Sequence, residues 1–167
     1  GGRYFIFVKL TTQCGITGWG EIYNASFGPH LVAAMAEEVF AHEMAGEDPF
    51  QIEKIWRRVY SRCFSQRPDI SLMGVLSGLE IACWDIIGKA TDQPVHNLLG
   101  GKLHQKLRSY SYLYPPEGAD AETFYADPDA SAEIAERYIQ EGFTAVKFDT
   151  SVAYTNLGPL MQSLEDI

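Results

Sequence analysis

The residues best suited to chemistry are Lys147 and Asp149, near the end of segment 142–149. This segment follows a helical pattern and has the composition of a buried strand. Side chains alternate between the two faces of a strand, so Lys147 and Asp149 point one way while Val146 and Phe148 point the other. Barrel enzymes keep their acid/base groups at the carboxyl ends of strands that follow helices. The pair therefore predicts acid/base chemistry.

The elements that must position this pair form a strand–helix–strand unit. Residues 109–114 read as a strand that ends at Pro115, and a polar loop follows. Residues 129–141 have the spacing of an amphipathic helix, and segment 142–149 is the second strand. A unit of this length predicts two parallel strands joined by a crossover helix.

The amino-terminal part predicts a hairpin followed by helices. Residues 4–11 and 16–23 are rich in aromatic and β-branched residues and flank a turn at Gly15. Apolar residues on both faces of the first strand indicate that both faces are covered, or that a partner is missing. Three segments with helical spacing follow, at residues 29–44, 49–62 and 71–90.

The starts of these helices carry recognisable signals. Asp48 is expected to be the N-cap of the second helix, with Pro49 at its first position. Ser71 is expected to cap the third helix. That helix is apolar around much of its circumference, which predicts the central helix of the domain. A short helix at 95–99 should follow it.

Composition excludes several classes of protein. The chain has 167 residues, of which 46% are hydrophobic, and its net charge is −9. This acidity argues against nucleic-acid partners and against anionic membrane surfaces. The apolar run 72–87 contains Glu80 and Asp85, so we expect no membrane span. Three widely spaced cysteines and no signal peptide predict a cytoplasmic protein without a disulfide framework or zinc site.

Several motifs together resemble the enolase superfamily, and within it the mandelate racemase and muconate-lactonising group. They are GWGE at 18–21, GLEIACWDIIGK at 78–89, PV at 94–95, LLGG at 98–101 and VKFD at 146–149. The resemblance implies an α+β capping domain, here residues 1–105. It also implies that residues 106–167 begin a modified (β/α)8 TIM-type barrel, which is incomplete. A helix-cap pattern at Ser163, just before the end, favours a chain that is cut there.

The resemblance also implies a reaction. Enzymes of this superfamily remove the proton α to a carboxylate, and a bound Mg²⁺ stabilises the resulting enediolate. The acidic metal ligands lie on the third to fifth barrel strands, so none is expected in this chain. The implied partner is a small carboxylate substrate, a sugar acid, and the favoured reaction is its dehydration. Racemisation, epimerisation or cycloisomerisation is the alternative among enzymes, and a catalytically inactive capping-domain fragment is the alternative outside them.

The second-strand motif is the only catalytic motif of the superfamily that the chain carries. Lys147 matches the first lysine of a Lys-x-Lys pair, and Asp149 stands where the second lysine, commonly the base, would be. A neighbouring carboxylate favours the charged ammonium of Lys147. We therefore expect Lys147 to act electrostatically or by hydrogen bonding, with the base supplied from elsewhere, which favours dehydration over a two-base racemisation.

The resemblance further implies two substrate-reading loops in the capping domain, at residues 22–29 and 63–70. Their candidate binding residues are Tyr23, Asn24, Ser26 and Arg67. Polar groups and one guanidinium suit a hydroxylated, anionic substrate. Tyr114, at the end of the first barrel strand, is a further candidate for the mouth of the barrel.

Each candidate also has a structural interpretation. Lys147 could pair with Asp149 at a strand end, Tyr114 could pack as a core aromatic residue, and Arg67 could be a surface arginine. An unclosed barrel exposes strand edges and apolar faces, so we expect the chain alone to aggregate or to form a homo-oligomer.

Other polar residues are expected to be structural. Asp85 and Lys89 are four residues apart, which predicts an ion pair on one helix. Glu21 is expected to be a strand-end acid, and His30 opens a helix with little sign of a catalytic role.

Overall fold

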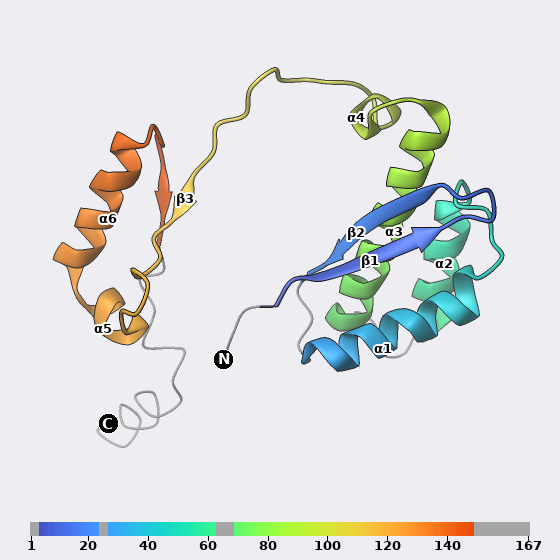
Figure 1. Cartoon of the computed structure of the whole chain (residues 1–167), viewed down its shortest axis with the longest axis horizontal. Helices are drawn as coiled ribbons and strands as arrows, with labels where there is room; N and C mark the ends of the chain where they lie inside the picture. Colours follow the sequence, from blue (N-terminus) through green and yellow to red (C-terminus); the bar gives the residue numbers. More distant parts are fainter. Residues whose placement is uncertain (1–3, 24–26, 63–68, 149–167) are drawn as a thin grey trace. The chain divides into compact units, whose positions relative to one another are not determined.

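The computed structural model describes residues 4–23, 27–62 and 69–148 (Figure 1). The chain divides into two compact units, Gly1–Leu103 and His104–Ile167.

A β-hairpin opens the first unit. Strand β1 (Ile6–Thr11) pairs antiparallel with β2 (Thr17–Ile22), as the sequence predicts. Side chains of β1 alternate between half-buried and exposed positions, and Phe7 is 61% exposed. One face of β1 therefore packs on the helices, and within the described residues the other face is open. Of the two predicted alternatives, the described residues do not cover both faces of β1, and the open face agrees with a missing partner.

Helices fill the rest of the first unit. The first predicted helix is α1 (Pro29–Val39), continued by one π-helical stretch, η1 (Phe40–Met44). The others are α2 (Ile52–Arg62), α3 (Ile70–Thr91) and the short α4 (Val95–Leu98). Helix α3 contacts β2, α1 and α2, which confirms its predicted central place (Figure 1).

Two predicted helix starts are wrong. Asp48 forms a turn before α2, because its carboxylate accepts the Phe50 N–H at 2.9 Å and its carbonyl accepts the Gln51 N–H at 2.9 Å. Asp48 and Pro49 are part of this turn and not of the helix, which begins at Ile52.

The cap of α3 is Asp69 instead of Ser71. The Asp69 carboxylate accepts the N–H groups of Ser71 and Leu72, at 2.9 and 3.1 Å. An ionised carboxylate is a stronger acceptor than a hydroxyl, and Ser71 itself is buried in the first turn.

Helix α3 and strand β2 approach closely because glycines face each other. A Cβ atom added to Gly20 would lie 1.9 Å from the carbonyl oxygen of Gly78. One added to Gly18 would lie 2.1 Å from the carbonyl oxygen of Ala82. Side chains larger than hydrogen therefore cannot occupy these β2 positions without moving the helix.

The core of the first unit lies where the hairpin and the helices meet. Its buried members are Ile22, Val32, Ala36, Val39, Met44, Ile55, Val59, Val75, Leu76, Leu79 and Cys83. By length and composition alone, α3 could cross a membrane, but half of that apolar stretch is buried in the fold. Packing inside the first unit accounts for its apolar character.

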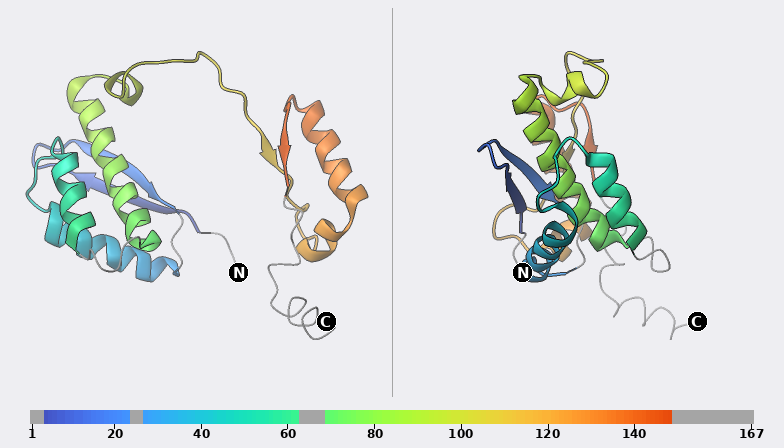
Figure 2. Two further views of the ribbon diagram at one scale, coloured as in Figure 1. Left: turned by 180° about the vertical axis from the view of Figure 1, so that it is seen from behind. Right: turned by 90° about the vertical axis from the view of Figure 1, so that its right-hand side faces the viewer.

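The second unit is the predicted strand–helix–strand arrangement. Strands β3 (Ser111–Tyr112) and β4 (Val146–Lys147) pair in parallel, and α6 (Pro128–Gln140) connects them. Both strands are shorter than predicted. The parallel pairing is confirmed, and α6 lies along one side of the pair (Figure 2).

The loop after β3 contains a helix that the sequence interpretation missed. Helix α5 (Ala121–Ala126) is capped by Asp120, whose carboxylate accepts the Thr123 N–H at 2.8 Å. Its polar residues made it resemble a loop, but Phe124 is buried with Leu113 and Ile134 in the core of this unit. One buried aromatic ring and an aspartate cap are sufficient to place this short helix.

Candidate functional site

Lys147 lies on the face of the β3–β4 pair that points away from the helices. Its neighbour Val146 packs against the buried cluster of Leu113, Phe124 and Ile134. Because adjacent strand residues point to opposite faces, the exposed Lys147 is directed to the other side. The prediction that Val146 and Lys147 point to opposite faces of the strand is therefore confirmed.

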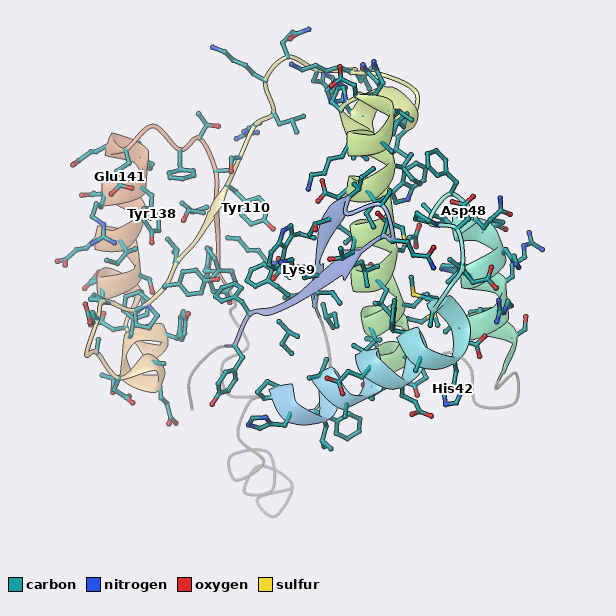
Figure 3. All side chains as sticks on the ribbon, turned by 45° about the vertical axis from the view of Figure 1, so that its right-hand side comes forward. Lys9, His42, Asp48, Tyr110, Tyr138 and Glu141 are labelled. Atoms are coloured by element: carbon teal, nitrogen blue, oxygen red, sulfur yellow. The ribbon has the colours of Figure 1, made fainter. Side chains whose placement is uncertain are left out.

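Three tyrosines share this face with Lys147. Lys147 pairs in register with Tyr112, and its Nζ lies 5.8 Å from the centre of the Tyr112 ring. The same atom lies 5.9 Å from the centre of the Tyr110 ring, which Figure 3 labels. Tyr114 continues the row, with its ring centre 5.0 Å from that of Tyr112. The structure thus places two predicted residues, Lys147 and Tyr114, on one aromatic surface.

Tyr110 and Tyr112 are the neighbours of Lys147 that sequence reasoning missed. The signal was present in the segment SYSYLY, where tyrosine recurs at every second position. This period places all three rings on one face of a strand. Only the pairing of β3 with β4, however, places Lys147 next to these tyrosines.

The remaining predicted site residues divide into two groups. Asp149, Asn24, Ser26 and Arg67 lie outside the described residues. Tyr23 follows β2 and is 79% exposed.

Tyr23 borders a cavity of about 440 Å³ between the end of β2 and α3. Glu21 and Ser77 also line it. Tyr23 therefore lies at a mainly apolar hollow of the first unit that carries a few polar groups.

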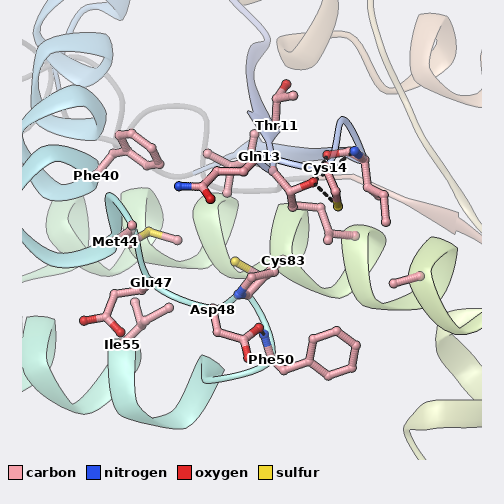
Figure 4. A pocket seen from close by; sticks show the side chains of 17 residues that line it. Thr11, Gln13, Cys14, Phe40, Met44, Glu47, Asp48, Phe50, Ile55 and Cys83 are labelled. Carbon is pink, nitrogen blue, oxygen red and sulfur yellow. Dashed lines mark hydrogen bonds between the residues drawn. The ribbon is translucent and has the colours of Figure 1, made fainter.

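A larger cavity of about 540 Å³ lies between the hairpin turn, η1 and α3 (Figure 4). Its wall is mainly apolar and carries two thiols, Cys14 and Cys83. The Thr12 hydroxyl lies 3.1 Å from the Cys14 sulfur, and this hydrogen bond lowers the pKa of Cys14. Burial, followed by the charge of Glu80, raises the pKa of Cys83 to about 11. The two thiols therefore differ in pKa, and none of the predicted site residues that the structure describes lines this cavity.

The described residues do not form a metal site. Within residues 4–23, 27–62 and 69–148, no group of three or more His, Cys, Asp or Glu side chains is arranged to hold a metal ion.

Comparison with known proteins identifies the family. Residues 2–100 match the family model of the mandelate racemase/muconate lactonizing enzyme N-terminal domain. The chain belongs to this family. The resemblance predicted from the sequence motifs is confirmed, and the hairpin with its helices is the N-terminal capping domain of the family.

Solved structures of this family are similar over most of the chain. A mandelate racemase/muconate lactonizing enzyme from Sulfitobacter sp. is 52% identical, with a TM-score of 0.81, over 89% of this chain and 38% of that one. A family protein from Labrenzia alexandrii DFL-11 is 63% identical, with a TM-score of 0.79 and the same coverage.

Relatives with assigned activities are more distant. The D-gluconate/D-galactonate dehydratase of Picrophilus torridus is 36% identical over 149 residues, which are 86% of this chain and 34% of that protein. The chain therefore spans about a third of the length of the curated relatives that it matches.

Proposed function

We propose that this chain is the amino-terminal part of an enzyme that removes the proton α to the carboxylate of a sugar acid and then eliminates the β-hydroxyl as water. The observation that carries the proposal is the position of Lys147, exposed on the helix-free face of a parallel strand in a chain of this family. The names of the dehydratase relatives support a sugar acid as substrate.

The proposal assigns residues 1–105 to the capping domain and residues 106–167 to the start of a (β/α)8 barrel. In such a barrel, the face opposite the helices is the interior, and active sites form at the carboxyl ends of the strands. Lys147 and Tyr114 would then line the interior. This arrangement agrees with β3 and β4 being parallel and with their helices on one side.

Lys147 is proposed to bind the substrate carboxylate and to stabilise the negative charge that develops when the α-proton leaves. Asp149 would orient Lys147, and the base would come from elsewhere in the protein. Tyr23, Asn24, Ser26, Arg67 and Tyr114 are proposed to bind the hydroxylated part of the substrate. An ammonium and a guanidinium both match a carboxylate, and hydroxyl and amide groups match a polyol.

Magnesium belongs to the proposal for the longer protein, because membership of this superfamily generally implies it. Its ligands are proposed to lie beyond residue 167. We also propose that the longer protein is a homo-oligomer, and light scattering measures its assembly directly. Its proposed location is the cytoplasm.

The central test is a screen of sugar acids with a protein that extends this chain through a complete barrel. Lys147→Ala should lower kcat by about 100-fold or more, the range for loss of one charge-stabilising group. Lys102→Ala, at an exposed position between α4 and β3, is the matched control and should leave kcat unchanged. Normal turnover by Lys147→Ala would remove Lys147 from the reaction.

Arg67 provides a separate test of substrate binding. Arg67→Ala should raise KM for a sugar acid because a carboxylate or hydroxyl group of the substrate loses the guanidinium that binds it. An unchanged KM would remove Arg67 from the binding site.

Racemisation, epimerisation and cycloisomerisation remain the alternative reactions, and the same screen distinguishes them by product. Dehydration yields a 2-keto acid, whereas the alternatives yield an isomer. The Lys-x-Asp spacing favours dehydration, since the second cation of a Lys-x-Lys pair is absent.

The remaining alternative is that the 167-residue chain folds without catalytic activity. A Mg²⁺ titration followed by thermal unfolding tests it, because a ligand that binds only the folded state raises the unfolding temperature. We expect no increase for this chain and an increase for the longer protein. An increase for the 167-residue chain would place metal ligands within it.

A further inference from the structure

The ammonium of Lys147 is held by aromatic rings. Its Nζ lies 5.8 Å from the centre of the Tyr112 ring and 5.9 Å from that of Tyr110. Both distances fall within the range of about 6 Å in which a cation is attracted to the face of a ring. Two rings therefore contribute to the position of one ammonium.

This environment differs from that of other lysines in the chain. Lys54 and Lys89 each donate to a carboxylate at 2.7 Å. In the part of the chain that the structure describes, Lys147 forms no such ion pair. A ring face attracts the ammonium without neutralising its charge, so the contact with these two rings is compatible with binding of an anion by Lys147.

The strand pairing fixes this arrangement. The Leu113 N–H donates to the Lys147 carbonyl at 2.8 Å, and the Ser111 N–H donates to the Ala145 carbonyl at 3.3 Å. These hydrogen bonds lie on either side of Tyr112 and hold its backbone in register with that of Lys147. The two side chains therefore project from neighbouring positions of the paired strands. Tyr114 lies beside Tyr112, with ring centres 5.0 Å apart and ring planes inclined by 36°, so Tyr112 has an aromatic neighbour on its own strand.

We propose that Tyr110 and Tyr112 are positioning residues that hold the Lys147 ammonium on the face of the β3–β4 pair that points away from the helices. The ligand that this arrangement suits is a carboxylate. That ligand, though not the aromatic contact itself, rests on the function proposed above. The tyrosines act through Lys147, and their hydroxyl groups are not required for this role.

Nuclear magnetic resonance of the 167-residue chain labelled with ¹³C-lysine tests the contact directly. Protons above a ring face are shifted upfield, so the ε-methylene signal of Lys147 should lie upfield of those of Lys54 and Lys89. Lys9 is the internal positive control, because its Nζ lies 5.6 Å from the centre of the Trp19 ring in the other unit.

Two variants of Tyr112 separate the ring from its hydroxyl. Tyr112→Leu should move the Lys147 signal toward those of Lys54 and Lys89 and leave the Lys9 signal in place. Tyr112→Phe should keep the upfield position, since the ring face remains. If Tyr112→Leu does not fold, Tyr110→Leu gives the same test at a ring that is 57% exposed.

A Lys147 signal without an upfield shift, or one that neither leucine variant moves, would overturn the positioning role. This measurement needs no turnover, so failure of the sugar-acid screen would leave it intact. In the extended protein, Tyr112→Leu should reduce kcat/KM and Tyr112→Phe should restore it. Equal kcat/KM for Tyr112→Leu and the parent protein would overturn the role in substrate binding.

Discussion

The carboxylate of Asp85 on α3 accepts a hydrogen bond from the backbone N–H of Trp19 on β2, with 2.9 Å between the nitrogen and Oδ2. Lys89 donates to the same oxygen at 2.7 Å and to the carbonyl of Thr17 at 2.8 Å. The predicted helical ion pair is confirmed. It also joins the central helix to the hairpin, which gives it more importance for stability than an isolated surface pair.

Removal of this connection should weaken the capping domain. Asp85→Ala removes the acceptor for both Trp19 and Lys89, so we expect the free energy of unfolding to fall by about 1–2 kcal/mol. Urea denaturation measures it. The control is Glu53→Ala, which breaks an exposed pair with Arg57 and should cost less than about 0.5 kcal/mol. Equal losses in the two variants would show that the connection to β2 adds nothing.

The same aspartate predicts a dependence of stability on pH. Partial burial raises the pKa of Asp85, but the hydrogen bonds from Lys89 and Trp19 outweigh it, so the pKa lies below its ordinary value of about 3.9. The folded state then binds protons less readily than the unfolded state. The stabilisation is present above about pH 4 and is lost as the pH falls through the folded pKa.

Urea midpoints of the parent chain and of Asp85→Asn, measured between pH 7 and pH 2, test this pH dependence. The difference between the two proteins should shrink as the pH falls below about 4. A constant difference across this range would contradict the lowered pKa.

The close approach of β2 to α3 predicts a strong effect of one methyl group. Gly20→Ala places a Cβ atom 1.9 Å from the Gly78 carbonyl oxygen, so strand and helix must separate. We expect a loss of about 3 kcal/mol in the free energy of unfolding. Gly28→Ala is the control because nothing lies within 4 Å of the added atom, and it should cost less than about 1 kcal/mol. A mild effect at Gly20 would contradict the glycine-to-glycine contact.

The two thiols of the large cavity should react at different rates. Cys14 is exposed and its pKa is lowered, so iodoacetamide should modify it rapidly at pH 7.5. Cys83 is buried and its pKa is raised to about 11, so it should react only after unfolding in urea. Peptide mass spectrometry reads each site separately. Rapid labelling of Cys83 in the folded chain would show that α3 opens or that the cavity admits the reagent.

Much of the fold could be predicted from local patterns. The hairpin, the central helix and the parallel strand pair follow from side-chain periods of two and 3.6 residues. The exact starts of α2 and α3 could not, because Asp48 closes a turn before α2 and because Asp69 caps α3 two residues before the serine that the sequence favours. Helix α5 was missed because its single buried residue, Phe124, leaves no period to detect.

For the candidate site, the sequence by itself determined that Lys147 points away from Val146 and that three tyrosines share one strand face. Alternation along a strand is a local property of the backbone, so it needs no partner. Only the tertiary structure decided that Tyr112 lies opposite Lys147 and that Asp85 reaches Trp19. Register and helix-to-strand contact depend on the packing of segments far apart in the sequence, and no single segment encodes them.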